Sequence, residues 1–176
     1  SNRPVTTAAE FEGLSIRVPP NPMWIATFDA LGARGEQVAW AEVYGALASG
    51  VVDAAEAPLG SIFGSSLQEN ADTISMTGHF YAWIGLMMND DLYANMPDDL
   101  REILATSALD AGDFLTDLVQ ERQGEFIETF ESQGVTVIQE VDRDSMREAT
   151  LSVYEQFPEW TPGLHQTVQD ILAGAE

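Results

Sequence analysis

The chain has no cysteine, no lysine and only two histidines, His79 and His165, among its 176 residues. Without cysteine, a disulfide framework, a thiolate nucleophile and a cysteine-ligated zinc site are excluded. Two histidines are too few for a typical histidine-based metal cage. We therefore expect no metal site and no cofactor.

Enzyme signature motifs are also missing from the sequence. There is no Gly-x-Ser-x-Gly, no His-Glu-x-x-His and no phosphate-binding glycine-rich loop, and residues 60–64 do not have the spacing of a nucleophile elbow. No run approaches the roughly 18 consecutive apolar residues that mark a membrane span. We therefore expect neither an enzyme nor direct insertion into a membrane.

Negative charge dominates the composition. The chain has 29 acidic residues against seven basic ones, all arginine, which gives a formal net charge of −22. A field of this sign repels nucleic acid and anionic lipid, so both are disfavoured as partners. The acidic residues are spread along the chain and 45% of all residues are hydrophobic, so we expect a folded domain with an acidic surface and no disordered acidic tail.

One short stretch near the amino terminus places an arginine at the end of a strand. Apolar and polar side chains alternate over residues 14–18, which is the pattern of a β-strand, and Pro19 and Pro20 prevent further pairing. Arg17 therefore lies at the carboxyl end of the strand, where open α/β sheets bind ligands. Its planar guanidinium matches a carboxylate, although a strand-end arginine is more often a surface ion-pair partner.

The first half of the chain alternates between strand and helix patterns. We expect strands at 36–39, 51–56 and 73–76, helices at 22–31 and 40–48, and short helical pieces within 59–70. Alternating strands and helices imply an α/β fold with a mainly parallel sheet flanked by helices.

The second half is mostly helical. Residues 79–88 are crowded with apolar side chains and predict a strand with both faces buried, followed by a turn at 89–91. An apolar stripe predicts one helix over 97–133, about 55 Å long, which is more than one small domain can cover. A strand at 135–139, a helix capped by Asp142 that runs to about 157, and a helix at 162–173 complete the chain.

Five motifs occur in an order that resembles the solute-binding proteins of tripartite ATP-independent periplasmic (TRAP) transporters, the dicarboxylate-receptor (DctP) type. The motifs are Asn2–Val5 with Glu10–Pro19, Glu42–Leu47, Gly50–Asp53, Thr77–His79 and Met96–Leu100. In that family two α/β lobes close around a small carboxylic acid, which is then passed to a membrane permease. The resemblance implies a periplasmic receptor, or a fragment of one, for a small organic acid, with the TRAP permease subunits as its partners.

The resemblance also implies a division of the chain. Residues 1–88 would form the second α/β lobe, like a lobe of a periplasmic binding protein. Residues 89–134 would form a connecting segment and a long helix that reaches toward the first lobe, and residues 135–176 a return strand and C-terminal helices. Most of the first lobe would be missing. The exposed face could then favour a homo-oligomer or domain exchange between copies.

Five positions correspond to ligand-binding positions of the family. By this resemblance, Arg17 would clamp the carboxylate, Trp40 would cover the ligand, Glu56 would lie at a strand end near it, and His79 would begin the strand that crosses toward the other lobe. Ala57 replaces an asparagine that binds the ligand in commoner members, which leaves the identity of the acid open. The Glu-Trp-Val-Gly-Pro variant that accompanies metal-assisted binding in some relatives is absent.

Each residue also has a structural interpretation, and the whole chain has a second functional one. Trp40 and His79 could belong to the core, and Glu56 could be a solvated strand end. The chain could be an acidic protein-interaction or sensor module derived from the same lobe, without a role in transport.

Overall fold

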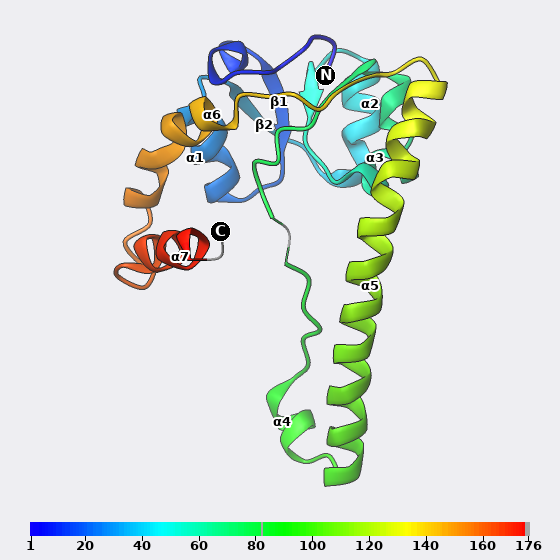
Figure 1. Ribbon diagram of the computed structural model, residues 1–176, viewed down its shortest axis with the longest axis vertical. Helices are drawn as coiled ribbons and strands as arrows, with labels where there is room; N and C mark the ends of the chain where they lie inside the picture. The colour runs from blue at the N-terminus through cyan, green and yellow to red at the C-terminus, as the bar shows by residue number, and fades with distance from the viewer. Residues whose placement is uncertain (82, 175–176) are drawn as a thin grey trace.

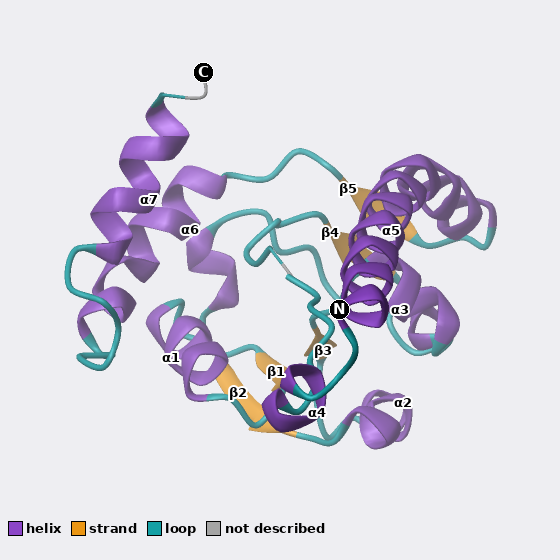
Figure 2. Ribbon diagram, turned by 90° about the horizontal axis from the view of Figure 1, so that it is seen from below, coloured by secondary structure: helices purple, strands orange, loops and turns teal. Residues whose placement is uncertain are grey.

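The computed structural model describes residues 1–81 and 83–174, and its body is built around two small parallel sheets (Figures 1 and 2). The first sheet has the order β2-β1-β3, with β1 at Ser15–Val18, β2 at Arg34–Gln37 and β3 at Ala54–Ala55. All four residues of β1 are buried, as expected for the central strand. The α/β fold with parallel strands is thus confirmed.

Helices cover the first sheet on both sides (Figure 2). On one side lie α1 (Pro22–Ala30) and α6 (Arg143–Thr150), and on the other lie α2 (Val43–Ala48) and α3 (Leu59–Gly64). Short 3₁₀ helices occur at Ala8–Phe11, Trp40–Glu42, Leu67–Glu69 and Leu151–Glu155. The main core is formed by buried apolar residues of β1, β3, α1, α6 and the first 3₁₀ helix and of the segments beside them, namely Val5, Phe11, Leu14, Ile16, Val18, Phe28, Leu31, Ala33, Ala54 and Met146.

The second sheet joins distant parts of the chain. It pairs β4 (Thr73–Ser75) with β5 (Thr136–Ile138), and between them the chain forms α4 (Asp90–Ala94) and α5 (Asp98–Ser132). The 35-residue α5 is continuous, as the apolar stripe predicts, and is about 50 Å long. Its C-terminal end lies beside α3, and the rest of the helix projects from the body (Figure 1). The last helix of the described residues is α7 (Leu164–Ala173), which lies on the other side of the molecule from α5 (Figure 1).

The prediction of a strand over residues 79–88 is wrong. Ala82 lies outside the described residues, and the described part of the segment has no strand pairing and runs from the body to α4 (Figure 1). Tyr81, Trp83 and Met87 are 90%, 95% and 97% exposed, so the segment is not buried on both faces. A strand needs a neighbouring backbone to satisfy its N–H and C=O groups, and the described chain places none beside this segment.

Other elements differ from the prediction mainly at their ends. Strand β2 starts two residues earlier than expected, and β3 has two residues instead of six. The expected turn at 89–91 is the start of α4, where the Asn89 side chain accepts a hydrogen bond from the Leu92 N–H. Asp142 caps α6 as predicted, but the helix continues only as a 3₁₀ turn after Thr150.

No helix within residues 1–81 and 83–174 combines the length and the apolar composition needed to cross a bilayer. Helix α5 is long enough, but charged residues recur along its whole length.

Candidate functional site

Arg17 is buried at the carboxyl end of the central strand. It lies opposite Ala55 of β3 and Glu36 of β2, and it is 5% exposed. Its Nε donates a hydrogen bond to the carbonyl of Val38 over 2.9 Å. Burial lowers the pKa of the guanidinium, and the negative charge of Glu56 partly offsets this effect. Arginine nevertheless stays protonated at neutral pH, because its pKa starts so high.

The terminal nitrogens of Arg17 differ from its Nε in their hydrogen bonding. Among the described residues, they donate no hydrogen bond. The guanidinium carbon lies 5.3 Å from the centre of the Trp40 ring, which is the distance of a cation–π contact. Trp40 itself is 40% exposed, so the ring that contacts the arginine is also open to solvent.

Glu56 connects the arginine to two other side chains. It directly follows the β3 residue Ala55, and its Oε1 lies 4.0 Å from Nη1 of Arg17. The same oxygen accepts a hydrogen bond from Nε1 of Trp24 over 3.0 Å. The other oxygen, Oε2, lies 3.5 Å from Nε2 of His79. The carboxylate is therefore surrounded by one cation and two ring nitrogens.

His79 reaches the site through a tight turn after β4. Gly78 has a φ of +61°, a left-handed conformation that favours glycine. Nδ1 of His79 is hydrogen-bonded to Oγ1 of Thr77 over 2.7 Å, and the ring packs against Phe28 and Phe80 at 5.4 and 5.0 Å between centroids. Nε2 is buried and has no hydrogen-bond partner among the described residues.

An arginine from α6 braces this turn from outside. Arg143 donates hydrogen bonds to the carbonyls of Met76 and Thr77, over 2.8 and 3.2 Å. Because α6 packs in the main core through Met146, the turn that carries His79 is tied to the body.

The structure brings Arg17, Trp40, Glu56 and His79 into one site from four separate segments. Ala57 follows Glu56 and is half-buried, and its methyl group can form no hydrogen bond with a ligand. Within the described chain, no group of three acidic or histidine residues is placed to hold a metal ion.

Sequence reasoning missed Trp24 as a member of the site. Its spacing matches the apolar stripe of α1, which marks it as a core residue, and its partner Glu56 lies 32 positions away. The one available signal is general: a tryptophan that is expected to be buried needs a hydrogen-bond acceptor for its indole N–H.

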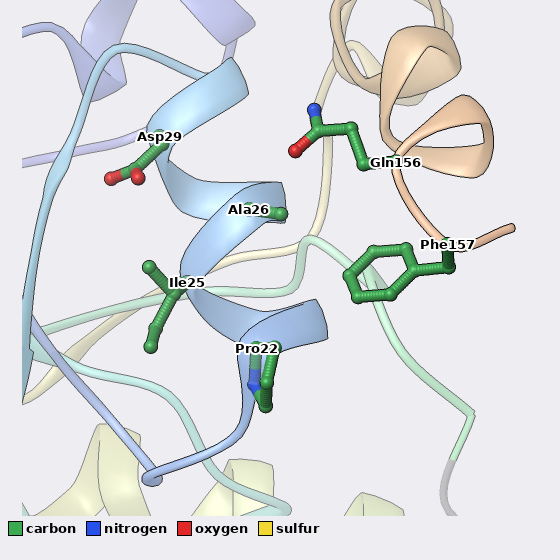
Figure 3. Close-up of a pocket in the computed structure, with 6 residues that line it drawn as sticks. All are labelled: Pro22, Ile25, Ala26, Asp29, Gln156 and Phe157. Atoms are coloured by element: carbon green, nitrogen blue, oxygen red, sulfur yellow. The ribbon is translucent and has the colours of Figure 1, made fainter. Parts of the chain in front are cut away.

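A separate hollow of about 320 Å³ lies between α1 and the chain after the last 3₁₀ helix (Figure 3). Its lining residues are Pro22, Ile25, Ala26, Asp29, Gln156 and Phe157. A neighbouring hollow of about 310 Å³ shares Pro22 and Phe157. Neither contains Arg17 or Glu56, so the arginine site is distinct from both.

Two solved structures to which the chain is similar are TRAP periplasmic solute-binding proteins. The protein from Ochrobacterium anthropi, with bound L-fuconate, is 34% identical with a TM-score of 0.83, over 97% of this chain and 56% of that one. The protein from Roseobacter denitrificans, with bound β-D-glucuronate, is 27% identical with a TM-score of 0.84, over 96% of this chain and 56% of that one.

The chain belongs to the family of bacterial extracellular solute-binding proteins, family 7 (DctP), whose model matches residues 1–159. It is also similar to the 2,3-diketo-L-gulonate-binding periplasmic protein YiaO of Escherichia coli, with 32% identity over 85% of this chain and 45% of that protein. The chain thus spans about half the length of these relatives. The resemblance based on the five motifs is confirmed.

Proposed function

We propose that the chain binds the carboxylate of a small organic acid at Arg17, as part of a periplasmic receptor that delivers the acid to a TRAP-type permease. The observation that carries this proposal is the burial of Arg17 at the end of a parallel sheet, with no hydrogen bond from its terminal nitrogens to the described residues. A carboxylate can accept two parallel hydrogen bonds from such a group.

The neighbouring residues suit an acid that also carries hydroxyl groups. Glu56 can accept hydrogen bonds from a ligand, His79 can donate or accept through Nε2, and Trp40 supplies an apolar face. The relatives named above have bound sugar acids, which combine a carboxylate with hydroxyls. The net charge of −22 does not prevent such binding. Salt at 0.1 M screens the charges that lie more than about 10 Å from the ligand, whereas Arg17 would contact the carboxylate directly.

The division of the chain follows from the same proposal. Residues 1–88 form one lobe of the receptor, 89–134 connect it to the other lobe, and 135–176 return to the lobe formed by residues 1–88. Apolar residues of α5 such as Ile103 and Phe114 are 60% and 68% exposed, and the other lobe covers them. Copies of the isolated chain would then associate through these residues. Light scattering tests this, because it measures the molar mass of the particles in solution.

A stability screen tests the function. L-fuconate, β-D-glucuronate and simple dicarboxylates are added in turn, and the thermal midpoint is recorded for each. We expect an acid to raise the midpoint and its methyl ester, which lacks the charge, to have little effect. The proposal is wrong if the acid and the ester stabilise equally, or if the Arg17→Ala variant responds like the unchanged chain.

A further inference from the structure

Arg17 and Glu56 are close, yet they are not hydrogen-bonded. Nη1 of Arg17 lies 4.0 Å from Oε1 of Glu56, whereas a charge-assisted hydrogen bond spans about 2.7–2.9 Å. Both side chains are largely buried, with 7% and 15% of their surfaces exposed. Partial burial strengthens the attraction between opposite charges, so an unrestrained glutamate would rotate to form a direct pair with the arginine. Another contact must therefore hold the two groups apart.

The contact that does this is the hydrogen bond from Trp24. Its Nε1 donates to Oε1 of Glu56 over 3.0 Å, and this is the same oxygen that faces Arg17. The guanidinium cannot move to meet it, because Nε of Arg17 is bound to the Val38 carbonyl over 2.9 Å. Approach of Glu56 to the arginine thus moves Oε1 from the position in which it accepts the hydrogen bond of Trp24.

Trp24 is itself held in place. It lies in the first turn of α1, whose start is fixed by the Asn21 side chain accepting from the Met23 N–H over 2.9 Å. Its ring packs on Phe80 with 4.3 Å between centroids, and it contacts the main core. The indole N–H therefore points at Glu56 from a rigid support.

We propose that Trp24 is a positioning residue that holds Glu56 away from Arg17 and so keeps the guanidinium free for the carboxylate of a ligand. The role rests on the proposed function, since it matters only if a carboxylate binds at Arg17. Without the indole N–H, Glu56 becomes an internal competitor for the two terminal nitrogens.

The experiment compares Trp24→Phe, Glu56→Gln and the double variant in NMR titrations with the acid that the stability screen selects, or with β-D-glucuronate if it selects none. Trp24→Phe keeps an aromatic ring and removes only the N–H donor. Trp160→Phe is the matched control, because Trp160 lies outside the arginine site and stacks on Phe157. The indole N–H signals report directly whether the Trp24 bond is present.

We expect Trp24→Phe to weaken binding by about tenfold to a hundredfold, the value of a hydrogen bond to a charged group. In the Glu56→Gln background the same change should have an effect of less than about threefold, because a neutral amide competes weakly for arginine. The role is refuted if Trp24→Phe binds like the unchanged chain, or if it loses equal affinity in both backgrounds, as a purely structural residue would.

Failure of the proposed function gives a different result. If the unchanged chain binds none of the acids, the proposed binding of these acids at Arg17 is refuted, and the crystal structure of Trp24→Phe still decides the role of the indole. A Glu56 oxygen within about 3 Å of Nη1 of Arg17 supports it. An unchanged separation of 4.0 Å overturns it.

Discussion

Two phenylalanines on the same helix should respond very differently to replacement by alanine. Phe130 lies near the end of α5, is 0% exposed, and packs edge-on against Phe63 of α3 at 6.2 Å between ring centroids. Removing a fully buried phenylalanine side chain costs about 3–5 kcal/mol, because the apolar surface is lost and a cavity remains. Phe130→Ala should therefore lower the free energy of unfolding by this amount, measured by urea denaturation followed by circular dichroism.

Phe114→Ala is the matched control in the same helix. Phe114 is 68% exposed, so its replacement should change the free energy of unfolding by less than about 1 kcal/mol. If the two replacements instead lowered the free energy of unfolding by amounts that agree within about 0.5 kcal/mol, the result would contradict the conclusion that the C-terminal end of α5 packs in the core and the middle of the helix does not.

Two further predictions concern helix propensity and pH. Gly112→Ala and Gly124→Ala should each stabilise the chain by roughly 0.5–1 kcal/mol, since a β-carbon at either position meets no atom within 4 Å; a lower urea midpoint would contradict this. Hydrogen bonds from the backbone and side chain of Thr6 and from the N–H of Thr7 lower the pKa of Glu10. Its carboxylate thus stabilises the fold above its unfolded pKa of about 4.3, and this stabilisation is lost as the pH falls through the lower folded pKa. Glu10→Gln should lower the thermal midpoint at pH 7, and the difference should shrink in acid; a constant difference would show that the charge is not responsible.

Much of the fold could be predicted because local patterns and tertiary packing agree. The alternation around Arg17 gives β1, and the cap at Asp142 marks the start of α6. The apolar stripe continues through Gly112 and Gly124, and α5 is indeed unbroken. In each case the pattern extends over enough residues, or includes a strong enough cap, to specify one structure.

The segment after His79 could not be predicted from its composition. Its apolar side chains indicate burial, but whether they form a strand depends on a neighbouring backbone, which composition cannot reveal. The ends of β2 and β3 were misplaced for a related reason, because pairing with β1 and not the residues themselves sets their length.

The site could be predicted only in part. The strand pattern predicts Arg17, and the family resemblance adds Trp40, Glu56 and His79. The structure brings these four residues together, although their role in binding stays a prediction. Trp24 could not be found in this way. Its helical spacing predicts a core residue whether or not its N–H is bonded to a distant carboxylate, so the sequence does not reveal the bond to Glu56.

The most direct test of the account is the affinity of Arg17 variants for the acid found by the stability screen. Arg17→Ala, with its fold checked by circular dichroism, should weaken binding by about 2–5 kcal/mol, which is roughly 30-fold to several thousandfold in the dissociation constant. Arg17→Lys should lose nearly as much, because lysine keeps the charge but lacks the planar fork. Binding by folded Arg17→Ala within about threefold of the unchanged chain would show that Arg17 is only the ion-pair partner of Glu56 and does not bind the ligand.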